Sequence, residues 1–426
     1  MLKKTILLVV IVLLFIFSAC SKITYTEVLR KNMDGKSEYS SLTDFQKLML
    51  EDYEYMWNML RKNYPLWGVI KRRGIDADKV YEIYKKQINT VENEIDFYNL
   101  IDNTIKSFFR IGHLELLNYN RFKYTQFAIN KMSDDNKYDI HNDILYSKKI
   151  EEAYEKLRIV KNENKIEYEY YDLSLGDARF NNVKYYDLVE NEVAYIDIKS
   201  FSNVHINDDY ITLENIYKKI KDYKHVVFDI SHNKGGESTY YLDNIVKPNI
   251  GENKLRYDSY ILMQKEKYNE KFLNIAGYQF DNLKSVSELP YFENINKDDF
   301  EFAPYFFCAN DIVYSDAKEK ALNGRIWVII SGDSYSAADA FAYFCKETGF
   351  ATLLGQTTGG NGFGISMGLF KLPNSHYVVM YSPSIGLNSD GSNNIEIGTK
   401  PDYYITGDNK NIKFINDCLK VIQNNK

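Results

Sequence analysis

Residues 326–344 read IWVIISGDSYSAADAFAYF and carry the clearest signal of the fold. The continuous apolar run, 326–331, is typical of a strand that is buried on both faces. A polar loop follows, and the small and apolar residues after Ser336 predict a helix. Ser331, Ser334 and Ser336 all lie in or beside the loop, where Ser and Asp commonly cap a helix. The stretch by itself leaves open whether one of these serines is a nucleophile.

Two earlier segments repeat this order of strand, loop and helix. VAYIDI at 193–198 predicts a strand, 208–222 a helix, and HVVFDIS at 225–231 a second buried strand before a Gly235-Gly236 loop. Alternating strands and helices predict a largely parallel, layered α/β domain. Loops that leave the carboxyl ends of neighbouring strands meet at one rim, so loops 231–238 and 331–337 should lie together.

The rest of the chain divides into flanking parts. Apolar spacing predicts a helix that starts near Ser41 and ends before Pro65, and two more through 80–88 and 95–108. We therefore interpret 41–115 as a helical N-terminal domain. Residues 116–190 are polar and rich in tyrosine, and their fold stays unassigned. The α/β domain occupies 191–405, and 406–426 contains a closing helix at 412–424.

The first 20 residues are typical of an export signal. Lys3 and Lys4 precede twelve apolar residues, 6–17, which are fewer than the ~20 that a spanning helix needs. The sequence FSAC resembles a bacterial lipoprotein box, with Phe17 where leucine is usual, and implies a lipidated Cys20. Residues 21–40 would then be a tether, and the protein an extracytoplasmic, membrane-anchored lipoprotein. An ordinary cleaved signal and an uncleaved anchor are the alternatives.

Composition excludes several other classes of protein. The chain has 426 residues and a net charge of −6, and this lack of basic excess argues against nucleic acid as a partner. Cys308, Cys345 and Cys418 are too scattered for a disulfide framework, and we expect them to be buried. Neither CxxC nor HExxH occurs, so the sequence predicts no metal site and no cofactor.

Three motifs together resemble the tail-specific (C-terminal-processing) serine protease family. They are VAYIDIKSF at 193–201, VVFDISHNKGG at 226–236 and DSYSAADAFAYFCKETGFATLLGQTTGG at 333–360. The resemblance covers 110–115 and 190–405, and it implies a crotonase-like (ClpP-like) layered β-β-α catalytic domain. It also implies that Ser336 is the nucleophile. The oxyanion donors would be backbone amides of Gly235 or Gly236 and of Ala337. Asp339 stands where the family usually has Glu.

The family activates its serine in two ways. One branch has lysine in Thr-x-Gly-Lys-Gly, but here that stretch is 358–362 and Asn361 replaces the lysine. The branch typified by the tricorn core protease uses a histidine and a glutamate. IGHLELL at 111–117 places His113 as the base, with His232 as its rival. IEIGTKPDY at 395–403 places Glu396 as the third catalytic residue, after a deletion of one residue.

The sequence thus predicts an exported, lipid-anchored serine peptidase that cleaves peptides or unfolded protein tails. Ser336 would attack, His113 would take its proton, and Glu396 would hold the imidazole. A second hypothesis is a non-catalytic peptide- or ligand-binding lipoprotein on the same fold, since fold does not fix function. A third is a Ser–Lys enzyme that uses Lys346 or Lys371.

Overall fold

A computed structural model describes residues 42–132, 144–163 and 181–425, apart from 366 and 410. Its largest sheet has the strand order β13-β9-β8-β4-β3-β2. The bounds are β2 Val183–Val189, β3 Val193–Ile198, β4 His225–Asp229, β8 Arg325–Ile330, β9 Thr352–Gly355 and β13 Tyr403–Tyr404. Every neighbouring pair is parallel except β2 and β3. The predicted parallel α/β arrangement is therefore present. Cys20, the tether and Ser41 lie outside the described residues.

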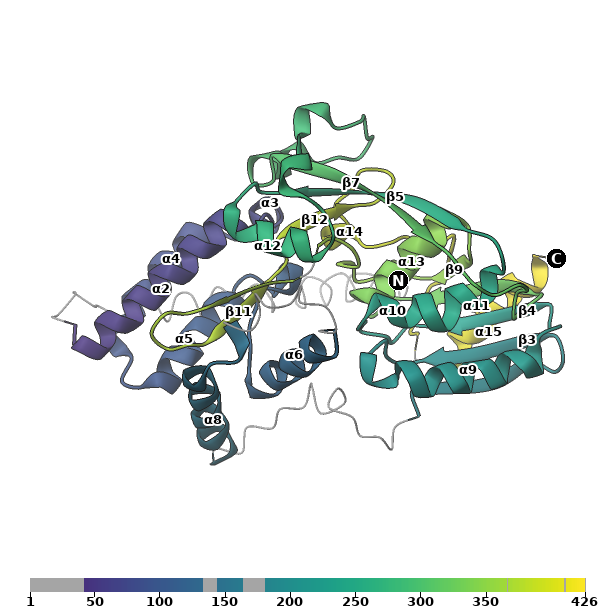
Figure 1. Cartoon of the computed structure of the whole chain (residues 1–426), viewed down its shortest axis with the longest axis horizontal. Coiled ribbons are helices and arrows are strands. Elements are labelled where there is room, and N and C mark those ends of the chain that lie inside the picture. The colour runs from purple at the N-terminus through teal and green to yellow at the C-terminus, as the bar shows by residue number, and fades with distance from the viewer. Residues whose placement is uncertain (1–41, 133–143, 164–180, 366, 410, 426) are drawn as a thin grey trace, which may run out of the picture.

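Helices cover both faces of this sheet (Figure 1). Helices α9 (Ile206–Ile220), α10 (Ser238–Tyr241) and α13 (Ala337–Thr348) pack on one face, and α15 (Ile412–Asn424) packs on the other. Alternate residues of one strand face opposite ways. Val226 and Phe228 therefore join the core under α9, α10 and α13, while Val227 joins the core under α15. Burial on both faces explains why the central strands are continuously apolar.

A second, antiparallel sheet lies above the first in Figure 1 and has the order β12-β5-β7-β6. Its long strands are β5 (Leu255–Met263) and β7 (Tyr305–Val313), and its edges are β6 (Lys284–Ser285) and β12 (Ser384–Leu387). Helix α12 (Lys267–Ile275) lies in the connection between β5 and β6. The sequence did not predict these strands, because their polar and apolar residues do not alternate strictly.

The helical region contains α2 (Asp44–Asn63), α4 (Ala77–Lys86) and α5 (Glu94–Lys106), as the apolar spacing predicted, and the short helix α3 (Trp67–Arg72), which it did not predict. Helix α2 ends just before Pro65, and its capping box is formed by Thr43 and Gln46. Thr43 Oγ1 accepts from the Gln46 amide and Gln46 Oε1 accepts from the Thr43 amide. The helix therefore begins at Asp44, three residues after the predicted start near Ser41.

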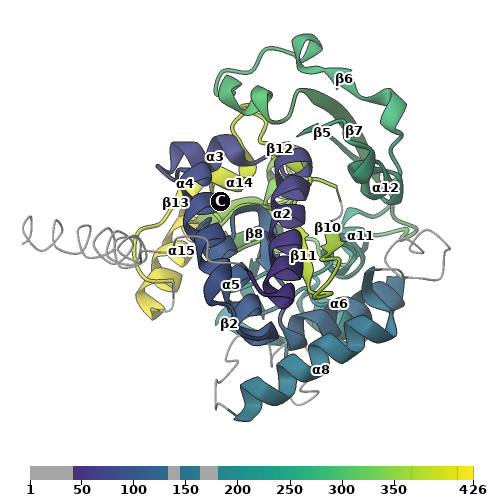
Figure 2. The same ribbon diagram turned by 90° about the vertical axis from the view of Figure 1, so that its left-hand side faces the viewer.

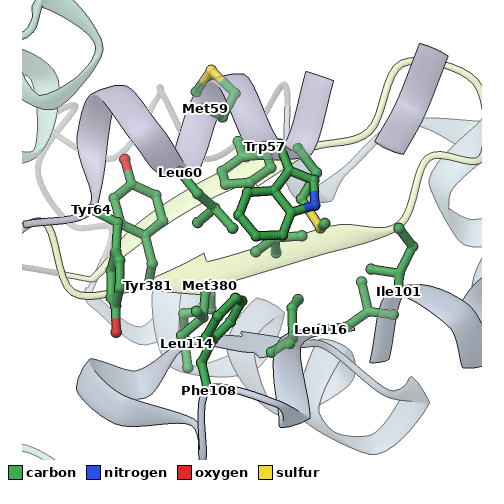
Figure 3. Packing of buried hydrophobic residues seen from close by; sticks show 14 of the residues in the cluster. Trp57, Met59, Leu60, Tyr64, Ile101, Phe108, Leu114, Leu116, Met380 and Tyr381 are labelled. Atoms are coloured by element: carbon green, nitrogen blue, oxygen red, sulfur yellow. The ribbon is translucent and has the colours of Figure 1, made fainter. Parts of the chain in front are cut away.

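A third sheet joins this helical region to the rest of the molecule. It pairs β1 (Glu115–Leu116) with β11 (Val378–Tyr381), and β11 with β10 (Gly368–Lys371). Trp57 and Leu60 of α2 lie over Met380 of β11, with Leu114 below (Figure 3). Figure 2 shows α2 beside β11 from another side. The helices thus share one core with strands from the second half of the chain.

Among its described residues, the region left unassigned by its sequence contains helices α6 (Tyr119–Met132) and α8 (Lys148–Glu163) as well as strand β2. These helices pack through Phe122 and Tyr154, whose rings stack at 4.0 Å between centroids. Of the described cysteines, Cys345 and Cys418 are buried, as predicted, whereas Cys308 is half-buried. None of the helices in the described ranges is both long and apolar enough to cross a membrane.

Candidate active site

One large cavity, of about 1210 Å³, lies where the three sheets approach each other. Its lining includes Ser336, His113 and the loop residues Gly235, Gly236 and Ala337. Ser336 follows β8 and the glycines follow β4, so they meet at the carboxyl edge of neighbouring parallel strands. His113 arrives from the helical region. The structure therefore brings together five of the six site residues that the sequence predicted for catalysis.

Ser336 has an uncommon backbone conformation, with φ 56° and ψ −126°. Residues with a side chain rarely adopt positive φ, and such conformations cluster at functional sites. Two backbone hydrogen bonds hold it: the Ser336 amide donates to the Gly360 carbonyl at 3.1 Å, and its carbonyl accepts from the Ala340 amide at 2.9 Å. The side chain is thereby presented at the start of α13, facing the cavity.

The other two serines of the loop have structural roles. Ser331 Oγ donates to the Ser231 carbonyl at 2.5 Å, and Ser334 Oγ donates to the Ile230 carbonyl at 2.8 Å. Both residues are buried, so neither faces substrate. They fasten the loop after β8 to the loop after β4, which keeps the Ser336 turn and the glycine loop in register.

The glycine loop lies directly against Ser336. A Cβ on Gly235 would approach the Ser336 Cβ and the Ala337 nitrogen to 2.8 Å, and φ is +94° there. Only glycine suits that position. The Gly235 amide already donates to Asn233 Oδ1 at 2.8 Å. The Gly236 and Ala337 amides, in contrast, have no hydrogen-bond acceptor among the described residues, so these two are available to donate to a bound group.

His113 is held by a tight turn, with φ 53° at His113 and 60° at Gly112. The flanking carbonyls are clamped from two sides. Tyr64 Oη donates to the Ile111 carbonyl at 2.8 Å, and the Ser382 amide donates to the Gly112 carbonyl at 2.7 Å. Leu114 is fully buried in the shared core. Packing of α2 and β11 therefore fixes where the imidazole lies.

The imidazole of His113 is adjacent to Tyr335, the residue before Ser336. Its ring centroid lies 5.1 Å from that of Tyr335, with the planes tilted by 60°. Burial and the positive charge of Arg121 lower the pKa of His113 to about 3. Arg121 itself is held by Glu115, from Nε to Oε1 at 2.9 Å. The imidazole is consequently neutral at physiological pH, so it can accept a proton, but a pKa this far below the operating pH also makes it a weak acceptor.

Glu396 is placed differently from the sequence-based expectation. It lies on α14 (Asn394–Ile397) and does not line the cavity. Its carboxylate pairs with Arg72 of α3, from Nη2 to Oε2 at 2.6 Å. Arg72 also binds Asp299 at 2.8 Å. The structure therefore does not bring Glu396 to the imidazole, because a guanidinium from the helical region holds its carboxylate.

Asn361, at the position of the family lysine, also lines the cavity. Its Nδ2 donates to Tyr335 Oη at 2.9 Å. Lys346 and Lys371 do not line the cavity, and Lys346 Nζ donates to the Lys400 carbonyl at 2.8 Å. The structure thus offers neither lysine to Ser336. Lys199 and Lys234 are the cavity-lining lysines, and Lys234 pairs with Asp333 at 2.5 Å.

Asp339, which replaces the family glutamate, is completely buried one turn into α13. Its Oδ1 accepts from the Thr399 amide at 3.2 Å and from the Thr358 hydroxyl. Burial raises the pKa of Asp339, and the hydrogen bond from Thr358 opposes that rise. This carboxyl group ties the segments that carry Asn361 and Glu396 to α13, and its role is structural.

Sequence reasoning missed several cavity residues. His232 does line the cavity, but Tyr335, Arg121 and Glu237 do so as well without any motif to mark them. Arg121 comes from the unassigned region, where no pattern pointed to a site. Within the described ranges, no group of three His, Cys, Asp or Glu side chains is arranged to hold a metal ion.

A positioned serine, two free amides and a neutral imidazole in one cavity define the class of serine hydrolase-like sites on an α/β fold. Residues 192–405, half of the chain, match Peptidase family S41, and residues 46–106 match the Tricorn protease C1 domain. The chain belongs to peptidase family S41. No functionally curated protein matches it.

Solved structures share this fold at low sequence identity. A protein of Parabacteroides merdae ATCC 43184 is 16% identical, with 87% of this chain and 95% of that chain covered and a TM-score of 0.51. Mature CPAF is 12% identical, with 88% and 96% covered and a TM-score of 0.52. At such identities the likeness shows the mixed α/β fold with its helical N-terminal region, and nothing about substrate.

Proposed function

We propose that the protein is a serine-type endopeptidase with Ser336 as nucleophile and His113 as general base. The observation that carries this proposal is that both side chains, supplied by distant parts of the chain, line one cavity. The cavity also contains the free amides of Gly236 and Ala337. Membership of a peptidase family supports peptide or unfolded protein as the substrate.

The mechanism follows from the positions of these groups. Ser336 Oγ attacks the peptide carbonyl while its proton passes to the His113 imidazole. The Gly236 and Ala337 amides donate to the oxyanion, and each such donor is worth about 3 kcal/mol in comparable sites. The imidazolium returns its proton to the leaving amine, and an acyl-enzyme remains. Water, deprotonated by the same imidazole, then releases the acid and restores Ser336.

No carboxylate orients the imidazole in this proposal. Contact with Tyr335 and the clamped turn at Gly112 take over the orienting role that the sequence analysis gave to Glu396. This absence of a carboxylate also favours the second candidate, a non-catalytic peptide-binding protein on the same fold. The two candidates differ in one property, which is the reactivity of Ser336.

Labelling with a fluorophosphonate probe tests the proposal. Wild type should react, and both Ser336→Ala and His113→Ala should lose the reaction. His376→Ala is a matched control, because His376 is also half-buried with positive φ, at 63°, but lies outside the cavity lining. It should label like wild type. A folded wild type that does not react would favour the binding protein.

We also propose that the chain is lipidated at Cys20 and anchored outside the cytoplasm, and that its layers are of the crotonase-like (ClpP-like) kind. The lipoprotein-like box at the N-terminus supports the anchor. Cells that express the full chain should incorporate an alkyne fatty acid into the wild type and not into Cys20→Ala. Equal incorporation in both would exclude this anchor.

A further inference from the structure

One face of α13 forms a wall of the cavity beyond the nucleophile. The residues that line it are Ser336, Ala337, Ala340 and Tyr343. Their spacing places Ala340 and Tyr343 one and two turns after Ser336, about 10 Å along the helix axis at the far end. The two alanines have the smallest side chains that a helix face can carry apart from glycine. They leave an open groove along α13 from Ser336 to Tyr343, which we call the lane.

The opposite wall of this lane belongs to the antiparallel sheet. Tyr257 of β5 pairs with Asp311 of β7, and Ser259 pairs with Ala309. These four residues alternate along their strands, so they share one face, and all line the cavity. Tyr278 lines the cavity beside them. The end of the lane is therefore a carboxylate among tyrosines.

The aromatic rings around this end are packed against one another. Tyr257 and Tyr343 lie 6.3 Å apart between ring centroids, and Tyr343 stacks on Phe363 at 4.0 Å. Phe363 also lines the cavity. Faces of tyrosine and phenylalanine rings attract cations, and the attraction grows when water is excluded. The rings thus form a cation-compatible wall rather than a simple apolar one.

Asp311 is half-buried and makes no ion pair within the described part of the chain. Burial raises the pKa of its carboxyl group, while hydrogen bonding with Tyr278 and Tyr257 opposes the rise. The basic residues that line the cavity come from other elements: Arg121 from α6, Lys199 after β3 and Lys234 after β4. A carboxylate in such surroundings lacks the cation that would compensate its burial.

We propose that this lane is the pocket for a lysine or arginine side chain of the residue whose carbonyl Ser336 attacks. The Cα of that residue is bonded to the attacked carbon, so its side chain is the one that enters beside Ala337 and Ala340. A long basic side chain reaches the end of the lane, where Asp311 and the tyrosines receive its charge. The proposal rests on the peptidase function above and adds the class of substrate.

Equilibrium binding tests the pocket without requiring catalysis. The probes are fluorescent capped peptides that differ at one residue: lysine, Nε-acetyl-lysine or norleucine. Full-length Ser336→Ala protein should bind the lysine peptide at least tenfold more tightly than the other two. The further change Asp311→Asn should bring the three affinities within about threefold of one another. Equal affinities in the Ser336→Ala protein itself would overturn the proposal, whether or not Asp311→Asn folds.

Asp258→Asn is the matched control. Asp258 is the next residue along β5 after Tyr257, is exposed, and does not line the cavity. Its Oδ1 accepts from Asn310 Nδ2 at 2.7 Å. This variant should keep the full preference for lysine, and loss of the preference in Asp258→Asn and Asp311→Asn alike would contradict a specific role for Asp311.

Hydrolysis by the protein with Ser336 intact separates the two proposals. The lysine peptide should be cleaved after lysine about 100-fold faster, in kcat/KM, than the norleucine peptide. Lysine-selective binding without any cleavage would sink the peptidase function and keep the pocket. Cleavage with no preference for lysine in binding or in kcat/KM would keep the peptidase and sink the pocket.

Discussion

The two halves of the candidate site are built in different ways. The nucleophile half, Ser336 with Gly235 and Gly236, lies on loops of adjacent parallel strands and is held by backbone hydrogen bonds and by Ser331 and Ser334. The base half, His113, comes from the helical region and is held by packing of α2 and β11. Glu396, expected beside His113, is instead bound to Arg72. Hydrogen bonds between two adjacent loops thus secure one half, whereas the packing of a helix and a strand that are far apart in the chain secures the other.

The largest effect should come from a side chain added where the glycine loop lies directly against Ser336. Gly235→Ala adds a Cβ 2.8 Å from Ser336 Cβ at φ +94°. We expect a loss of more than about 3 kcal/mol of stability and at least a 100-fold fall in kcat/KM. Thermal melting and peptide hydrolysis measure both.

Gly74→Ala is the control for that substitution. Gly74 also has a positive φ, +76°, but a Cβ there meets nothing within 4 Å. It should cost only about 1 kcal/mol and leave kcat/KM unchanged. Similar losses of activity in both variants would mean that backbone strain alone, rather than contact with Ser336, explains the effect.

The next effect concerns the protonation of the base half. With a pKa near 3, His113 is neutral and able to act as a base down to well below its ordinary titration near 6.5. The profile of kcat/KM against pH should therefore lack an acid limb near pH 6.5, and its fall should be centred near pH 3. Arg121→Met removes the nearby positive charge and so raises the pKa of His113, which should move the acid limb to higher pH.

An acid limb near pH 6.5 in both proteins would contradict the lowered pKa of His113 in the free enzyme. The same pKa makes a stability prediction with a definite sign. The unfolded chain binds a proton near pH 6.5 that the folded chain does not bind. The contribution of His113 to stability is therefore fully present above that pH and falls as the pH drops from 6.5 towards 3.

A smaller effect should follow from Glu396→Gln. The change weakens the ion pair with Arg72, whose side chain is 21% exposed, and leaves the Arg72–Asp299 pair in place. We expect a stability loss of about 1–2 kcal/mol and a change in kcat/KM of no more than about threefold. Chemical denaturation and steady-state kinetics are the measurements.

Asp44→Asn is the comparison for the ion pair, because Asp44 is 98% exposed in its pair with Lys47. It should leave stability unchanged within the error of chemical denaturation, because an exposed ion pair is screened by solvent. If Glu396→Gln instead lowered kcat 100-fold at unchanged stability, Glu396 would have to reach the imidazole in the working enzyme. The two halves of the site would then be less different than they are in this structure.

The smallest effects are expected from the lysines of the Ser–Lys alternative. Lys346→Met and Lys371→Met should leave kcat/KM within about twofold, because neither residue lines the cavity. Lys199→Met is the more demanding comparison, because Lys199 does line it, and burial and the charge of Lys184 lower the pKa of its ammonium group. Loss of fluorophosphonate labelling in that variant, with labelling retained in His113→Ala, would transfer the role of base to a lysine.

Much of the fold could be predicted because its signals are local. Apolar periodicity marked α2, α4 and α5, and continuous apolar runs marked β4 and β8. The strands β5 and β7 escaped prediction, since one face borders a cavity and so carries Tyr257, Ser259 and Asp311 among apolar residues. A strand that lines a binding site loses the alternation by which strands are identified.

The candidate site likewise has a part with local sequence signals and a part without them. A buried strand, a turn and a helix encode the shape of the loops at Ser336 and at Gly235-Gly236 within a few residues, and the family resemblance selected Ser336 among the three serines. The groups that surround the imidazole, in contrast, follow from tertiary packing. Neutrality of His113 depends on burial and on Arg121, and the place of Glu396 depends on Arg72. Electrostatic partners are chosen through space, among side chains far apart in the chain, and no local pattern records that choice.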